Sequence, residues 1–73
     1  EKSINIYPNP ATEIINIESK KIINKIKITD QLGKIILEKN QLKTLNISNL
    51  NKGTYIITLY IENKEIIKSF TKL

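Results

Sequence analysis

The sequence predicts an all-β domain, a seven-stranded antiparallel sandwich of the immunoglobulin-like type. Three observations predict this fold class. Apolar and polar residues alternate with a period of two along most of the 73 residues. Turn-forming residues interrupt the alternation at intervals of about 8 to 12 residues. Isoleucine, which is β-branched and suits a pleated strand, is the most frequent apolar residue.

Seven segments carry the strand pattern. In chain order they are residues 4–7, 13–18, 24–29, 34–38, 44–47, 54–61 and 65–71. The third segment alternates most regularly, with Ile26 and Ile28 on the expected core face. The last is ambiguous, because Lys68 has the same parity as Ile66 and Phe70. The expected core is Ile4, Ile6, Ile15, Ile17, Ile26, Ile28, Ile36, Leu45, Ile47, Tyr55, Ile57, Leu59 and Ile61.

Two alternatives to this fold remain open at the level of sequence. A helix over residues 35–45 competes with the fourth strand, although its apolar residues do not keep a period of 3.6. An open barrel of the OB or SH3 type competes with the sandwich as a whole.

The predicted turns depend on prolines, glycines and small polar residues. Pro8-Asn9-Pro10 should end the first strand and carry the chain to another sheet, because neither proline has an N–H for a central ladder. Asp30 and Gly33 predict a type I turn followed by a left-handed glycine. Gly53 predicts a second turn with positive φ, and Asn63-Lys64 predicts a tight hairpin.

Tyr55 follows the second glycine turn, with Leu50 upstream of it. A tyrosine in this position can fold its hydroxyl back onto the backbone of the turn, as in the tyrosine corner of Greek-key sandwiches. The alternative is that Tyr55 is an ordinary aromatic residue of a strand.

The composition argues against catalysis. The chain has no His and no Cys, so it lacks the commonest general base and the thiol nucleophile. With two glycines it has no phosphate-binding loop. Glu62 and Glu65 flank the predicted hairpin and are expected to face each other, most simply as exposed carboxylates screened by Lys64 and solvent. We therefore expect no enzymatic activity, no cofactor and no metal site.

The charge and hydropathy pattern also narrows the possible partners. The net charge is +5, but the lysines are spread along the chain and Arg is absent, which favours a solvated surface over a nucleic-acid interface. The longest apolar run, residues 55–61, is too short for a membrane-spanning helix, which needs about 18 residues. No apolar region of a signal peptide follows Glu1-Lys2-Ser3, and position 1 is not Met. We expect the chain to be a piece of a longer protein.

The ordered set of motifs resembles a known family. The motifs are Ile6-Tyr7-Pro8-Asn9-Pro10-Ala11-Thr12, Ile15-Asn16-Ile17, Ile26-Lys27-Ile28, Asp30-Gln31-Leu32-Gly33-Lys34, Leu45-Asn46-Ile47, Leu50-Asn51-Lys52-Gly53-Thr54-Tyr55 and Ile66-Ile67-Lys68-Ser69-Phe70-Thr71-Lys72. From about Ser3 to Leu73 the chain resembles the type IX (Por) secretion system C-terminal sorting domain, type A, of Bacteroidetes. Its departures are the absence of Arg and the presence of Leu73 after the last Lys.

The resemblance implies that residues 1–73 are a single sorting domain at the end of a secreted protein with an N-terminal cargo. It implies a route through the periplasm of a Gram-negative bacterium to the cell surface or the medium. The implied partners are the outer-membrane translocon with its shuttle, and a sortase-like peptidase that removes the domain; the cargo is then attached to surface lipopolysaccharide. The alternative is an adhesive or carbohydrate-binding sandwich, which exposed Tyr7 and Tyr60 side by side would favour.

The last strand is the expected recognition element, because it is terminal, carries two lysines and has an imperfect apolar pattern. Its residues are Ile66, Ile67, Lys68, Ser69, Phe70, Thr71, Lys72 and Leu73. The alternative is that this strand only completes the sandwich.

Overall fold

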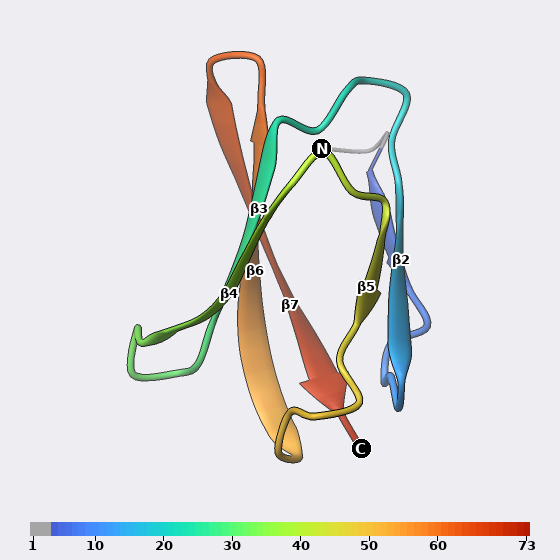
Figure 1. The fold of residues 1–73 in the computed structure, drawn as a ribbon, viewed down its shortest axis with the longest axis vertical. Coiled ribbons are helices and arrows are strands. Elements are labelled where there is room, and N and C mark those ends of the chain that lie inside the picture. Colours follow the sequence, from blue (N-terminus) through green and yellow to red (C-terminus); the bar gives the residue numbers. More distant parts are fainter. Residues whose placement is uncertain (1–3) are drawn as a thin grey trace.

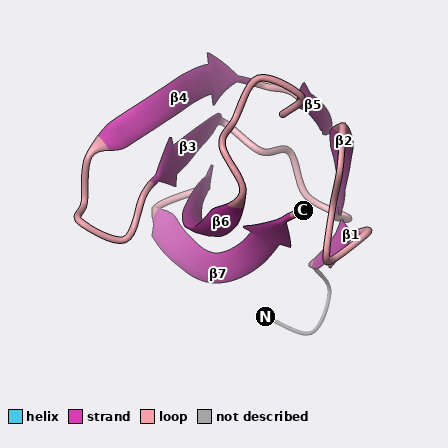
Figure 2. Cartoon of the chain, turned by 90° about the horizontal axis from the view of Figure 1, so that it is seen from below, coloured by secondary structure: helices cyan, strands magenta, loops and turns pink. Residues whose placement is uncertain are grey.

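The computed structural model describes residues 4–73, which form two antiparallel β-sheets and contain no helix. The three-stranded sheet has the order β1-β2-β5, with β1 at Asn5–Tyr7, β2 at Ile14–Glu18 and β5 at Thr44–Asn46. The four-stranded sheet has the order β4-β3-β6-β7, with β4 at Ile35–Asn40, β3 at Lys25–Thr29, β6 at Gly53–Ile61 and β7 at Lys64–Lys72. Figures 1 and 2 show the two sheets facing each other as the layers of a sandwich. The predicted fold class is confirmed, and residues 35–45 contain β4 and the first residues of β5 rather than a helix.

The core lies between the sheets and is filled mainly by isoleucine. Ile26 and Ile28 of β3 are fully buried, while the alternating residues Lys25 and Lys27 reach solvent, so the predicted register is correct. The strict alternation fixes this register, because a slip of one residue would bury the lysines. The buried apolar residues are Ile4, Ala11, Ile15, Ile17, Ile23, Ile26, Ile28, Leu45, Ile47, Tyr55, Ile57, Leu59, Ile61 and Phe70.

The expected core differs from the observed core at the fourth strand. Ile36 is exposed, and Leu37 packs against the core in its place. The cause is an irregularity in the pairing of β3 with β4 at Ile28/Thr29, where Thr29 pairs with Ile35. Such a bulge changes which residues of a strand face inward. Ile6 is only partly buried, although it packs against the core as expected.

The hairpin between β6 and β7 is one residue earlier than predicted. The loop is Glu62 and Asn63, not Asn63-Lys64, and Glu62 takes the positive φ of 56°. Glu62 and Glu65 therefore do not face each other, because Glu65 pairs with Tyr60 of β6.

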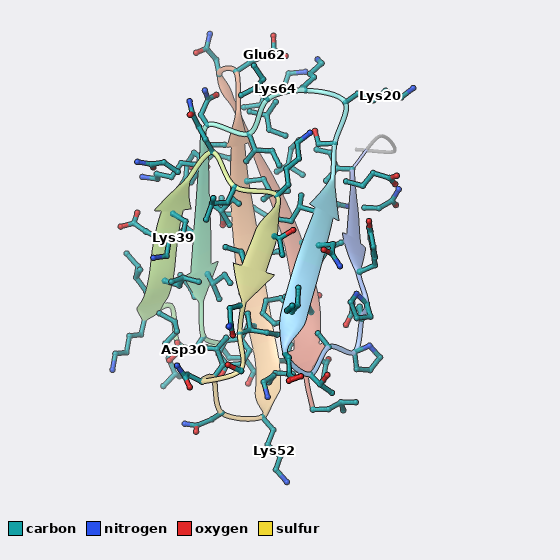
Figure 3. The ribbon with its side chains drawn as sticks, turned by 45° about the vertical axis from the view of Figure 1, so that its right-hand side comes forward. Lys20, Asp30, Lys39, Lys52, Glu62 and Lys64 are labelled. Atoms are coloured by element: carbon teal, nitrogen blue, oxygen red, sulfur yellow. The ribbon has the colours of Figure 1, made fainter. Side chains whose placement is uncertain are left out.

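The turns lie at the two ends of the sandwich. In Figure 3, Asp30 and Lys52 mark one end, and Lys20, Glu62 and Lys64 mark the other. The C-terminus lies at the end that carries Asp30 and Lys52 (Figures 1 and 3).

The segment between β1 and β2 contacts the four-stranded sheet at one residue. After Pro8-Asn9-Pro10, Ala11 forms a single parallel bridge to Lys72 of β7, and the chain then returns to pair β2 with β1. The predicted change of sheet is therefore correct for Ala11 alone. The expectation that the next strand would lie in another sheet is wrong, because β2 pairs with β1 in the three-stranded sheet.

Candidate functional site

Strand β7 forms one edge of the four-stranded sheet and contains most of the predicted recognition residues. Ile66, Lys68 and Phe70 pair with Leu59, Ile57 and Tyr55, which are buried. Because side chains on one face of a sheet lie opposite one another, these three β7 residues face the inner side of the sandwich. The facing that was ambiguous in sequence is thus resolved, and Lys68 is a half-buried lysine on the inner side of an edge strand.

The eight predicted recognition residues fall into two groups. Phe70 is buried at 1% exposure, and its ring stacks on Tyr55 with centroids 5.6 Å apart, so it belongs to the core. The others are accessible: Ile67, Ser69 and Leu73 are exposed, and Ile66, Lys68, Thr71 and Lys72 are half-buried. Strand β7 therefore both completes the sandwich and presents a surface.

Asn9 covers part of the edge of β7. Its side-chain amide donates to the carbonyl of Ser69 at 3.4 Å and accepts from the N–H of Thr71 at 3.0 Å. Ala11 continues this contact: its N–H donates to the carbonyl of Thr71, and its carbonyl accepts from the N–H of Leu73, both at 2.8 Å. The Pro-Asn-Pro segment therefore ties the end of β7 to the start of the domain, a role of Asn9 that the sequence did not reveal.

The rest of the β7 edge is open. Along an antiparallel strand, alternate residues direct their backbone groups to opposite sides. Since Ser69 and Thr71 bond outward to Asn9, the N–H and C=O groups of Glu65 and Ile67 point outward as well, as does the N–H of Ser69. Within residues 4–73 no strand pairs with this stretch, because β7 is the last strand of its sheet.

A groove runs beside this open edge. It is lined by Ile4, Asn5, Ile6, Asn9, Lys68 and Ser69, and has a volume of about 380 Å³. Its two sides are β1, at the edge of one sheet, and β7, at the edge of the other. Among the lining residues only Lys68 is ionisable, and the side chain of Asn5 donates a hydrogen bond to the Glu18 carboxylate at 2.9 Å.

The turn predicted at Asp30 and Gly33 is present, and Gly33 has the predicted positive φ. The Asp30 carboxylate accepts hydrogen bonds from the backbone N–H groups of Leu32 and Lys34, both at 2.9 Å. The Asp30 carbonyl accepts from Gly33, which has φ of 90°. Asp and Gly are therefore required here for a local turn between β3 and β4, and their role in this structure is architectural.

The tyrosine corner is also confirmed. The hydroxyl of Tyr55 donates to the backbone carbonyl of Asn51 at 2.6 Å, across the turn that contains Gly53 with φ of 148°. Leu50 packs against the core beside this turn. These residues fix the connection from β5 to β6.

The two exposed-face tyrosines do not form a shared platform. Tyr7 lies on β1 in the three-stranded sheet, and Tyr60 lies on β6 in the four-stranded sheet. The ammonium groups of Lys25 and Lys27 lie 4.8 and 5.8 Å from the centre of the Tyr60 ring. The hydrogen bond to Tyr60 raises the pKa of the Lys27 ammonium above its ordinary value. Tyr7 and Tyr60 therefore do not lie side by side, which is the arrangement that would favour a carbohydrate-binding module.

Glu62, in the loop between β6 and β7, forms an ion pair. The Lys21 ammonium lies 2.9 Å from Glu62, and its hydrogen bond and charge lower the pKa of the Glu62 carboxyl below its ordinary value. In the part of the chain that the structure describes, no group of three or more acidic residues could hold a metal ion.

Fold and site together define a small all-β module, with an open sheet edge as its most distinctive surface. The chain matches the model of the secretion system C-terminal sorting domain over residues 5–72, and it belongs to this family. It is therefore a C-terminal sorting signal of the type IX secretion system, as the ordered motifs indicated.

One solved structure with the same fold is that of PorZ, described as an essential bacterial surface component of the type IX secretion system of Porphyromonas gingivalis. The match has a TM-score of 0.75 at 17% sequence identity, and it covers 99% of this chain and 12% of the PorZ chain. At this identity it supports the fold. No curated protein matches the chain in sequence.

Family membership also sets where the protein acts. Membership in a family of secretion sorting domains indicates a protein that is exported to the cell surface or the medium. Among residues 4–73 there is no helix with the length and apolar character needed to cross a membrane.

Proposed function

We propose that residues 1–73 form a single sorting domain at the C-terminal end of a longer secreted protein, and that they direct its cargo from the periplasm to the outer-membrane translocon and its shuttle. A sortase-like peptidase then removes the domain. The observation that carries this proposal is the family match, which extends over residues 5–72 and so includes every strand. In this proposal the domain has no enzymatic activity and needs no cofactor.

We also propose that the secretion machinery recognises the domain at β7. Two features support this choice. The strand is at the edge of its sheet, so its backbone is available for pairing by β-augmentation. It also carries Lys68 and Lys72, both half-buried, which add charge complementarity to a partner.

The test is export of a passenger protein. A passenger with a signal peptide is fused to residues 1–73 and produced in a bacterium that has the type IX system. We expect the passenger at the cell surface or in the medium, and retained in the periplasm when the translocon gene is deleted. An intact fusion that stays in the periplasm of the wild-type strain contradicts the proposal.

Recognition by β7 needs a variant that keeps the strand. Deleting β7 would remove Phe70 from the core, so loss of export could reflect unfolding alone. Substitutions at accessible β7 positions avoid this problem. We expect Lys68→Ala combined with Lys72→Ala to lower export while the purified fusion keeps its resistance to protease. Normal export of this variant would mean that the lysines serve only as solvated charge.

A further inference from the structure

We propose that the groove between β1 and β7 binds one extended polypeptide strand, which runs parallel to β7 and places a carboxylate side chain beside Lys68. This inference rests on the proposed function, since the strand is taken to belong to the secretion machinery. It narrows the recognition surface to the open part of the β7 edge and gives the partner a direction and a charge.

The direction follows from contacts that the domain already makes. In a parallel pair, one residue bonds the residues before and after the one that it faces. The side-chain amide of Asn9 bonds the carbonyl of Ser69 and the N–H of Thr71, as a strand residue facing Phe70 would. Ala11 does the same with its backbone opposite Lys72, and its bridge is parallel. Residues 9–11 therefore form a short parallel ladder on β7.

An incoming strand can continue this ladder along the open edge. Its residue facing Lys68 would bond the carbonyl of Ile67 and the N–H of Ser69. Its residue facing Ile66 would bond the carbonyl of Glu65 and the N–H of Ile67. These are the backbone groups that point away from β6 and have no strand beside them. Four backbone hydrogen bonds become available without any change in the sandwich.

The charge of the partner follows from the groove. Its lining contains the ammonium of Lys68 and no carboxylate. Lys68 faces the inner side, so its side chain extends toward the space between the two sheet edges rather than over the outer face. A partner side chain that points to the same side meets this ammonium in a half-buried setting, where a carboxylate is favoured and a second cation is excluded.

The same lysine argues against a second copy of this chain as the occupant. A lysine on the inner side of an edge strand discourages edge-to-edge pairing of like molecules. Pairing of two β7 edges would bring a second Lys68 close to the first. The other edge of this sheet, β4, carries Lys39 opposite Ile26 and an irregular register, so it is protected in a similar way. The groove between β1 and β7 therefore favours a strand whose sequence differs from that of β7.

The experiment uses the passenger fusion with two matched pairs of variants. Ile67→Pro removes an outward N–H that β6 does not use, and Ile67→Ala keeps that N–H while removing the side chain. Lys68→Glu reverses the charge in the groove, and Lys68→Arg keeps it. We expect Ile67→Pro to lower export at least tenfold relative to Ile67→Ala, which keeps the backbone N–H, and Lys68→Glu to lower it at least tenfold relative to Lys68→Arg, which keeps the positive charge. Equal protease resistance of the purified fusions shows that the variants fold.

The outcomes separate this inference from the function on which it rests. If the unsubstituted fusion is not exported, the proposed function fails. If it is exported and the Lys68→Glu fusion is exported equally well, the groove is not the binding site. Export of a folded Ile67→Pro fusion excludes strand pairing; should that variant unfold, Ser69→Pro, which removes the other outward N–H of the proposed ladder, replaces it. A fusion that is a dimer by light scattering, and becomes monomeric with Ile67→Pro, identifies the occupant as a second copy and overturns the proposal.

Discussion

Removing the hydroxyl of Tyr55 should destabilise the domain by about 1 kcal/mol, the net value of one hydrogen bond. In Tyr55→Phe the ring stays, so its stack on Phe70 and the filled core are preserved. The lost contact is the 2.6 Å bond to the carbonyl of Asn51. Because Asn51 is exposed, its carbonyl can bond to water, and no penalty for a buried unpaired group is added.

The assay is thermal unfolding followed by circular dichroism. For a domain of this size, 1 kcal/mol corresponds to a fall in Tm of about 4–8 °C. Tyr7→Phe is the matched control, because Tyr7 is half exposed and a surface change of this kind alters stability by less than about 0.5 kcal/mol. If Tyr55→Phe and Tyr7→Phe shift Tm equally, the hydroxyl bond does not hold the β5–β6 connection.

Three further predictions concern the other contacts described above. Gly33→Ala should lower the free energy of unfolding by on the order of 1 kcal/mol in urea titration, because φ of 90° strains a Cβ although no atom lies within 4 Å of it; an unchanged midpoint contradicts this. Asn9→Ala should speed amide exchange at Thr71 without changing that at Ile57, and equal protection of Thr71 would mean that Asn9 does not cover the edge. Lys21→Ala should raise the pKa of the Glu62 carboxyl toward its ordinary value, as followed by NMR titration. Because the pair lowers this pKa in the folded state, its contribution to stability is present at neutral pH and is lost as the pH falls through the Glu62 pKa; an unchanged pKa refutes the pairing.

The sequence predicted the strands well wherever polar and apolar residues alternate strictly. The register of β3 is the best case, because Lys25 and Lys27 leave a single way to bury Ile26 and Ile28. The run Ile35-Ile36-Leu37 has no polar residue to mark the outer face, and the bulge at Ile28/Thr29 decides the facing instead. A bulge depends on how two strands meet, so one strand's sequence does not reveal it.

The turns also differ in how far local sequence determines them. Asp30, Gly33 and Tyr55 act within a few residues of their own position, so local sequence was sufficient. At the β6–β7 hairpin, the presence of Asn63 suggested the wrong loop position, because Glu62 adopts the positive φ that asparagine usually takes.

The open edge of β7 could not be predicted from the sequence. Asn9 meets β7 across 62 residues of chain, and the resulting ladder decides which β7 groups remain free. The core position of Phe70 and the inner position of Lys68 depend equally on pairing with β6. A proline on each side of Asn9 was the available signal, and it indicated a turn rather than a contact.

The contact between Asn9 and β7 has a consequence for biosynthesis. Residues 9–11 find their partners only when residues 69–73 have been made, and the core lacks its Phe70 ring until then. Such long-range pairing is slow to form and cannot begin on a partial chain. A polypeptide whose translation stops early would therefore carry no folded signal, and export that depends on this domain would be restricted to finished molecules.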